Sequence, residues 1–182
     1  MKELSLNILD ITENSVKAKA TLTEILIEET EKTLTITITD DGVGMSPETL
    51  EAVTNPFYTT RTTRNVGLGI PLLIMSAEQT GGFVKITSKV ASDEDSSHGT
   101  KVIANYNKDH IDFTPLGDVV STVVTLIQGH PDTDFLFIHR KGGAEVSLDT
   151  RELKEILGDI PLNSYEVIKW IEENLKEQYT LV

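Results

Sequence analysis

The chain has 182 residues, contains no cysteine and carries a formal net charge of −13. The lack of cysteine excludes disulfide bonds, thiol catalysis and cysteine metal sites, and it fits a cytoplasmic protein. A chain this acidic is repelled by a phosphate backbone, so we expect no nucleic-acid partner. No apolar run approaches the roughly 18 residues of a membrane span, and the first residues lack the features of a signal peptide, so no membrane partner is expected either.

The first elements are predicted from the spacing of apolar residues. Helical spacing predicts a helix over residues 3–19. Strict alternation predicts one strand in EILIEE and a second in TLTITITDDG, and the short ETEK between them suits a hairpin. Alternation with threonine is the pattern of a sheet that has one buried face.

Ser46 and Pro47 mark the start of the next helix, as the N-cap and the first helical residue. Residues 54–66 have no period and predict a loop, after which GLGIPLLIMSAEQT predicts a helix. Strands are expected around residues 83–90 and 100–106. This order indicates an α+β protein with a largely antiparallel sheet covered by helices on one face.

After Asn107 the pattern changes, and we divide the chain into residues 1–107 and an α+β extension of residues 108–182 whose role is unknown. PLGDVVSTVVTLIQG predicts either a buried helix or a strand, because its periodicity does not distinguish the two. DFLFIHRKGGAEVSLDT predicts a hairpin, and two helices follow it.

Two glycine clusters have the chemistry expected of a nucleotide site. Asp40 ends a strand and forms D-x-G-x-G with Gly42 and Gly44, where the carboxylate could accept a hydrogen bond from the exocyclic amine of adenine. The alternative is an ordinary Asp-Gly turn. Gly67 and Gly69 precede a helix whose N-terminal amides could stabilise anionic oxygens, unless the loop needs glycine only for its shape. The sequence contains no Walker loop.

Asp10, Asn14 and Lys17 fall on one face of the first predicted helix. The amide oxygen of Asn14 suits magnesium, which prefers oxygen ligands and keeps several waters. Lys17 can reach a phosphate, and Asp10 could hold a water or hydroxyl for attack. The alternative is a solvated helix face that has none of these roles.

Five motifs in order over residues 4–106 resemble those of the GHKL group of Bergerat-fold ATPases, which includes gyrase, a heat-shock chaperone, histidine kinases and the mismatch-repair ATPase. The Asn box is similar to DITENSVKA, the first glycine box to DDGVGM, the phenylalanine box to NPFYTT and the second glycine box to GLGIPLL, with a terminal Gly-Thr at residues 99–100. The short distance from NPFYTTR to GLGI is most similar to the ATP-binding domain of histidine kinases. The resemblance implies a two-layer α/β sandwich that holds ATP between helices and sheet under a mobile lid.

The resemblance also implies a role for each matching residue. Asn14 would coordinate Mg²⁺, Lys17 would contact phosphate, and Asp40 would read the adenine amine with support from Thr100. The remaining residues would bring backbone close to the ligand, line or brace the pocket, cradle the phosphates or neutralise the γ-phosphate: Gly42, Gly44, Met45, Phe57, Arg61, Arg64, Gly67, Leu68 and Gly69. For the two arginines, solvated loop positions are the alternative.

Asp10 stands where hydrolytic members of the group have a glutamate, which is one carbon longer. We therefore expect Asp10 to be a buried base that places an attacking water poorly, so that hydrolysis is slow. None of the four histidines stands in the context of a phosphoacceptor, and we expect each to be structural or at the surface. The chain thus resembles a stand-alone ATP-binding protein without a phosphoacceptor domain.

The resemblance implies a regulator that binds ATP and Mg²⁺ and acts on a protein partner in the manner of a histidine kinase or a serine kinase. The alternative is an ATP-dependent conformational switch with slow hydrolysis or none, whose output is protein binding. A third reading is an interaction module that binds no nucleotide. The identity of the partner is open, and so is the formation of a homodimer.

Overall fold

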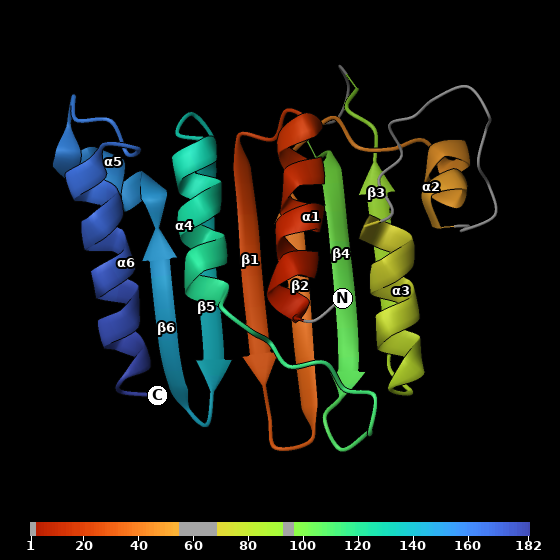
Figure 1. Ribbon diagram of the computed structural model, residues 1–182. Helices are drawn as coiled ribbons and strands as arrows, with labels where there is room; N and C mark the ends of the chain where they lie inside the picture. The colour runs from red at the N-terminus through yellow and green to blue at the C-terminus, as the bar shows by residue number, and fades with distance from the viewer. Residues whose placement is uncertain (1–2, 55–68, 93–96) are drawn as a thin grey trace.

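The computed structural model describes residues 3–54, 69–92 and 97–182. Helices and strands follow each other in the order that Figure 1 shows, and the predicted α+β class is confirmed. Their bounds are α1 Leu4–Lys17, β1 Leu22–Glu29, β2 Thr33–Asp40, α2 Pro47–Thr54, α3 Gly69–Gln79, β3 Phe83–Lys89, β4 Gly99–Asn107, α4 Val119–Gly129, β5 Asp134–Lys141, β6 Ala144–Asp149, α5 Thr150–Leu157 and α6 Tyr165–Tyr179.

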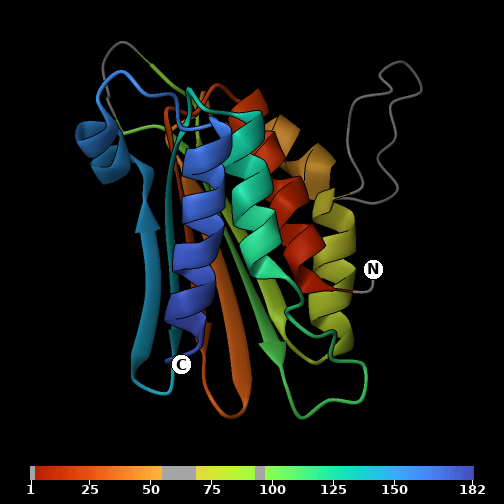
Figure 2. The same cartoon turned by 60° about the vertical axis from the view of Figure 1, so that its left-hand side comes forward.

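The described strands form one sheet in the order β3-β4-β2-β1-β5-β6. Neighbouring strands are antiparallel except β1 and β5, which are parallel. Helices α1, α3, α4 and α6 lie side by side over one face of this sheet, as both views show (Figures 1 and 2). The residues of β2 alternate as predicted, because Leu34, Ile36 and Ile38 are buried while the intervening threonines are only half-buried.

Helix α1 crosses the middle of the sheet and is fixed at its start by the chain that leads into α4. The backbone amides of Leu4 and Ser5 donate to the carbonyl oxygens of Pro115 and Leu116, at 3.0 and 2.8 Å. Its buried residues recur at helical spacing and include Ile8. Because the buried face is firmly packed, the polar face of α1 is held in one orientation toward its surroundings.

The segment after residue 107 continues the same sheet. The valine-rich stretch that was ambiguous in the sequence forms helix α4, whose N-cap Asp118 accepts a hydrogen bond from the backbone amide of Ser121 at 2.9 Å. Strand β5 pairs with β1 over eight residues, and β6 returns as the predicted hairpin. Phe137 of β5 and Ile171 of α6 belong to the same hydrophobic cluster as α1. The division at residue 107 stays a prediction.

The position of the second helix follows the prediction closely. The side chain of Ser46 accepts a hydrogen bond from the backbone amide of Thr49 at 3.3 Å, and Pro47 is the first helical residue. Within the residues that the structure describes, no helix is long and apolar enough to cross a membrane.

Burial of His139 predicts a loss of stability in mild acid. Its side chain is 4% exposed, Nδ1 lies 2.8 Å from the hydroxyl of Tyr179, and Nε2 lies 3.4 Å from a carboxylate oxygen of Glu29. Burial lowers the pKa of His139 below its usual value, although Glu29 opposes this effect. The folded protein therefore holds the ring neutral at a pH where the unfolded chain, with a pKa of about 6.5, already binds a proton.

Above about pH 6.5 the His139 ring is neutral in both the folded and the unfolded protein, so it adds no pH dependence to the free energy of unfolding. Below it, the free energy of unfolding should fall by up to about 1.4 kcal/mol per pH unit until the lowered pKa is reached. Urea unfolding at about pH 7.5 and about pH 5.5 measures this loss. His139→Gln can still bond Tyr179 but does not titrate, so it should reduce the loss. An equal loss in the variant would assign the acid sensitivity to other groups.

Candidate functional site

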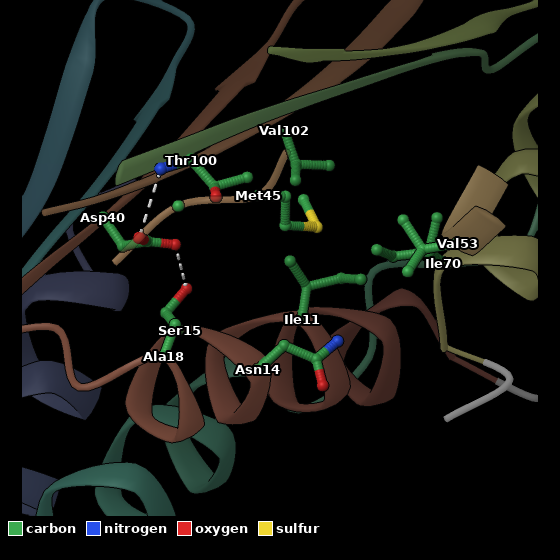
Figure 3. A pocket seen from close by; sticks show the side chains of 11 residues that line it. Ile11, Asn14, Ser15, Ala18, Asp40, Met45, Val53, Ile70, Thr100 and Val102 are labelled. Atoms are coloured by element: carbon green, nitrogen blue, oxygen red, sulfur yellow. Dashed lines mark hydrogen bonds between the residues drawn. The ribbon is translucent and has the colours of Figure 1, made fainter. Parts of the chain in front are cut away.

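A cavity of about 210 Å³ lies between α1 and the ends of β2 and β4. Asp40 and Thr100 stand at one end of it, and Val53 and Ile70 stand at the other (Figure 3). The remaining lining residues are Ile11, Asn14, Ser15, Ala18, Gly44, Met45 and Val102. The walls are thus mostly apolar, and the polar groups are concentrated at the Asp40 end and along α1, which is the usual design of a small-molecule site.

The carboxylate of Asp40 is 9% exposed and is fixed by three hydrogen bonds. Oδ1 accepts from the backbone amides of Gly42 at 3.0 Å and Thr100 at 3.2 Å, and Oδ2 accepts from the hydroxyl of Ser15 at 2.7 Å. A carboxylate has about four acceptor positions, so one remains for a ligand. Asp40 is therefore a firmly held acceptor at one end of the cavity.

Gly42 and Gly44 are required by close approach of the backbone. A Cβ on Gly42 would lie 2.8 Å from the carbonyl oxygen of Ala18. Gly44 has a φ of +70°, and a Cβ there would lie 1.9 Å from the carbonyl oxygen of Lys89. The turn after β2 therefore packs closely against the end of α1 on one side and the end of β3 on the other. This packing places Met45 in the cavity wall.

Two serines support the site and were not found from the sequence. The hydroxyl of Ser15 donates to Asp40. The hydroxyl of Ser88 in β3 accepts a hydrogen bond from the backbone amide of Met45 at 2.8 Å and lies 2.8 Å from the hydroxyl of Thr100. Ser88 stands opposite Thr100 in the register of β3 and β4. Only that register, which the sequence does not give, would have pointed to it.

Of the three polar residues of α1 that were predicted in the site, only one lines the cavity. Asn14 is half-buried and lines the cavity, whereas Lys17 is exposed and does not line it. Asp10 is also exposed, so the expectation that it is buried is wrong. The physical reason is helix geometry, because residues 10, 14 and 17 share a face that is turned away from the core-facing residues of α1.

Asp10 instead lies beside the start of α3. A Cβ on Gly69 would lie 3.2 Å from the Cβ of Asp10, so the glycine allows the helix N-terminus to come close to α1. The N-terminus of α3, whose first amides have no partner within the helix, therefore lies next to Asp10. Phe57, Arg61, Arg64, Gly67 and Leu68 were also predicted in the site, and they lie outside the described residues.

Two of the four histidines fix elements next to the site. The Nδ1 atom of His98 lies 2.7 Å from the carbonyl oxygen of Gly42. The Nε2 atom of His130, after α4, lies 2.7 Å from a carboxylate oxygen of Glu13, which is the neighbour of Asn14 in α1. These contacts link the turn after β2 and the exposed side of α1 to the segments around them.

A family model described as histidine kinase-, DNA gyrase B- and HSP90-like ATPase matches residues 2–110. The chain belongs to this ATPase family. The match covers all the described residues that line the cavity, and the Bergerat-type fold that the resemblance implied is confirmed.

Curated relatives include two sensor histidine kinases. ZraS of Salmonella typhimurium is 38% identical over 74 residues, which are 41% of this chain and 14% of ZraS. CpxA of Escherichia coli K12 is 33% identical over 81 residues, which are 42% of this chain and 18% of CpxA. The chain thus spans less than a fifth of the length of either relative.

Solved structures with a similar fold include a MutL ATPase domain and a domain of a DNA repair protein. The Aquifex aeolicus MutL ATPase domain complexed with ADP has a TM-score of 0.54 and 16% identity, over 97% of this chain and 70% of that one. The N-terminal domain of a DNA repair protein has a TM-score of 0.54 and 15% identity, over 82% of this chain and 53% of that one. At this identity the likeness shows the fold alone, and with MutL it extends beyond residue 110 into the C-terminal segment.

Proposed function

We propose that this protein is an ATP-binding regulator that acts on a protein partner, in the manner of a histidine kinase or a serine kinase. The observation that supports this most strongly is Asp40, a firmly held and almost buried acceptor at one end of a mostly apolar cavity. Adenine offers an exocyclic amine to such an acceptor, and the apolar walls suit its ring. The family match and the ADP bound by the MutL domain agree with an adenine nucleotide.

The residues on the α1 side fit the phosphate end of a nucleotide and its Mg²⁺. Asn14 presents a neutral oxygen donor at the cavity, which is a ligand type that Mg²⁺ accepts alongside phosphates and waters. When bound, Mg²⁺ would neutralise phosphate charge. Lys17 and the N-terminal amides of α3 would add positive potential on the same side.

Asn14→Ala tests this assignment. Because the amide should contact the metal and not the base, the variant should lose the part of ATP affinity that depends on Mg²⁺, while adenosine binds as before. Calorimetric titration with ATP, in the presence and absence of Mg²⁺, measures the metal-dependent part of the affinity. A titration with adenosine measures the affinity for the base and sugar alone. Equal losses for adenosine and for Mg²⁺-ATP would instead indicate a general disturbance of the cavity.

The exposed position of Asp10 favours a second candidate function, a nucleotide-dependent switch. An exposed carboxylate that is also one carbon shorter than glutamate is a poor holder of an attacking water. In that case ATP is sensed, and the output is protein binding. Incubation with radiolabelled ATP and the protein that co-purifies with the chain separates the two functions, because only a kinase transfers label to that protein.

A further inference from the structure

A groove of about 570 Å³ lies at the β3 edge of the helix-covered face of the sheet, between α2, α3 and β3 (Figure 1). It is separate from the Asp40 cavity, and the two share no lining residue. In Figure 1 helix α2 stands outside α3, beyond β3 at the edge of the sheet. The groove is lined by Pro47, Leu50, Glu51, Thr54, Ile74, Glu78, Val84 and Ile86.

The elements around this groove leave apolar side chains partly exposed. Helix α2 has no buried residue, and neither has β3. Leu50, Ile74, Val84 and Ile86 are each only half-buried, and all four line the groove. Four aliphatic side chains that are left partly exposed in one groove are a site for further apolar contact.

The edge of β3 provides hydrogen-bonding groups next to these side chains. Among the described strands only β4 pairs with β3, so alternate residues of β3 direct backbone groups away from the sheet. Val84 and Ile86 face the groove, while Lys85 faces the opposite, open side of the sheet. An added strand would therefore place every second side chain in the groove.

Charge decides what kind of strand fits. Glu51 of α2 and Glu78 of α3 line the groove, and no lysine, arginine or histidine of the described residues does. Glu78 is also in the last turn of α3, where the helix dipole adds negative potential. A second copy of this chain pairing through β3 would bring these acids toward their own copies, which is repulsive.

We propose that the β3 edge and its groove bind an extended segment of a protein partner, in which alternate residues are aliphatic and flanked by lysine or arginine. The aliphatic side chains cover Val84 and Ile86, and the cationic ones meet Glu51 and Glu78. The backbone of the segment pairs with β3. This site does not depend on the ATP proposal, although α2 and α3 wall both the groove and the Asp40 cavity.

The test uses the full chain and a blocked seven-residue peptide, with lysine at both ends, valine and isoleucine at the third and fifth positions, and threonine between. NMR titration should shift the methyl signals of Val84 and Ile86. Replacing both lysines by glutamate should weaken binding at least about tenfold. Failure of the lysine peptide to bind at millimolar concentration, or equal binding of both peptides, overturns the proposal.

Two controls separate a specific site from general attraction to an acidic protein. The double variant Glu51→Gln/Glu78→Gln should bind the peptide about fivefold more weakly, whereas Glu166→Gln/Glu177→Gln on the exposed face of α6 should not change binding. Two N-methylated forms of the peptide, one methylated at its odd residues and one at its even residues, should behave differently. One form should lose binding and the other should keep it, because an added strand pairs through one edge only. Equal effects of the two double variants, or of the two N-methyl series, contradict the proposal.

Discussion

Asp40→Asn should lower the affinity for ATP by about ten- to a hundredfold. The change replaces an acceptor by an amide, which can turn its oxygen toward the amides of Gly42 and Thr100 and its nitrogen toward the hydroxyl of Ser15. The contacts within the protein are thereby kept, but the acceptor for the adenine amine is lost. A hydrogen bond to a charged group contributes about 1.5–3 kcal/mol, which corresponds to this loss of affinity. Calorimetry of the purified variant measures it.

Asp40→Ala is the matched control for the fold. It leaves the amides of Gly42 and Thr100 without their acceptor in a nearly buried place, at a cost of about 1–3 kcal/mol for each unsatisfied group. The alanine variant should therefore unfold at a lower temperature, whereas the asparagine variant should unfold close to the parent. Unchanged ATP affinity in Asp40→Asn would show that adenine is not read by this residue.

Asp10→Asn should reduce ATP turnover to the background rate while ATP affinity is nearly kept. Asp10 lies one turn from Asn14 on the same helix face and beside the N-terminus of α3, where phosphates are expected. If it orients the attacking group, removal of its charge removes that function without touching the Asp40 end of the cavity. A phosphate-release assay at saturating ATP measures the rate.

Asp10→Glu is the informative companion variant. A misplacement of about 1 Å can cost on the order of a hundredfold in rate, so the parent should be slow and the longer side chain should raise turnover. The exposed position of Asp10 leaves room for the added carbon. Turnover in Asp10→Asn that equals the parent's would exclude Asp10 as the base and favour the switch function.

The parts of the site that the sequence revealed are those encoded by residues close together in the chain. Asp40 ends an alternating strand and precedes two glycines within four residues, so its place at a strand end followed directly. Asn14 was found because its helix is strongly periodic. The two glycines after Asp40, however, are explained by the approach of Ala18 and Lys89, which a sequence does not show.

The parts that were missed depend on contacts between distant segments. The hydroxyl of Ser15 meets Asp40 across 25 positions of sequence, and its buried place on α1 looked like ordinary packing. Helix α4 was ambiguous because its many β-branched valines and threonines also suit a strand, although its buried residues Val119, Val123 and Leu126 recur at helical spacing. The parallel pairing of β5 with β1 joins residues more than a hundred positions apart, and no local pattern specifies it.

The central claim is that Asp40 and the cavity around it bind an adenine nucleotide. Titration of the full chain with ATP and with GTP, in the presence of Mg²⁺, tests it most directly. The account predicts binding of one ATP per chain, with GTP at least about a hundredfold weaker, because guanine presents a carbonyl where adenine presents its amine and would leave Asp40 without a donor. Absence of ATP binding, or equal affinity for ATP and GTP, would contradict it.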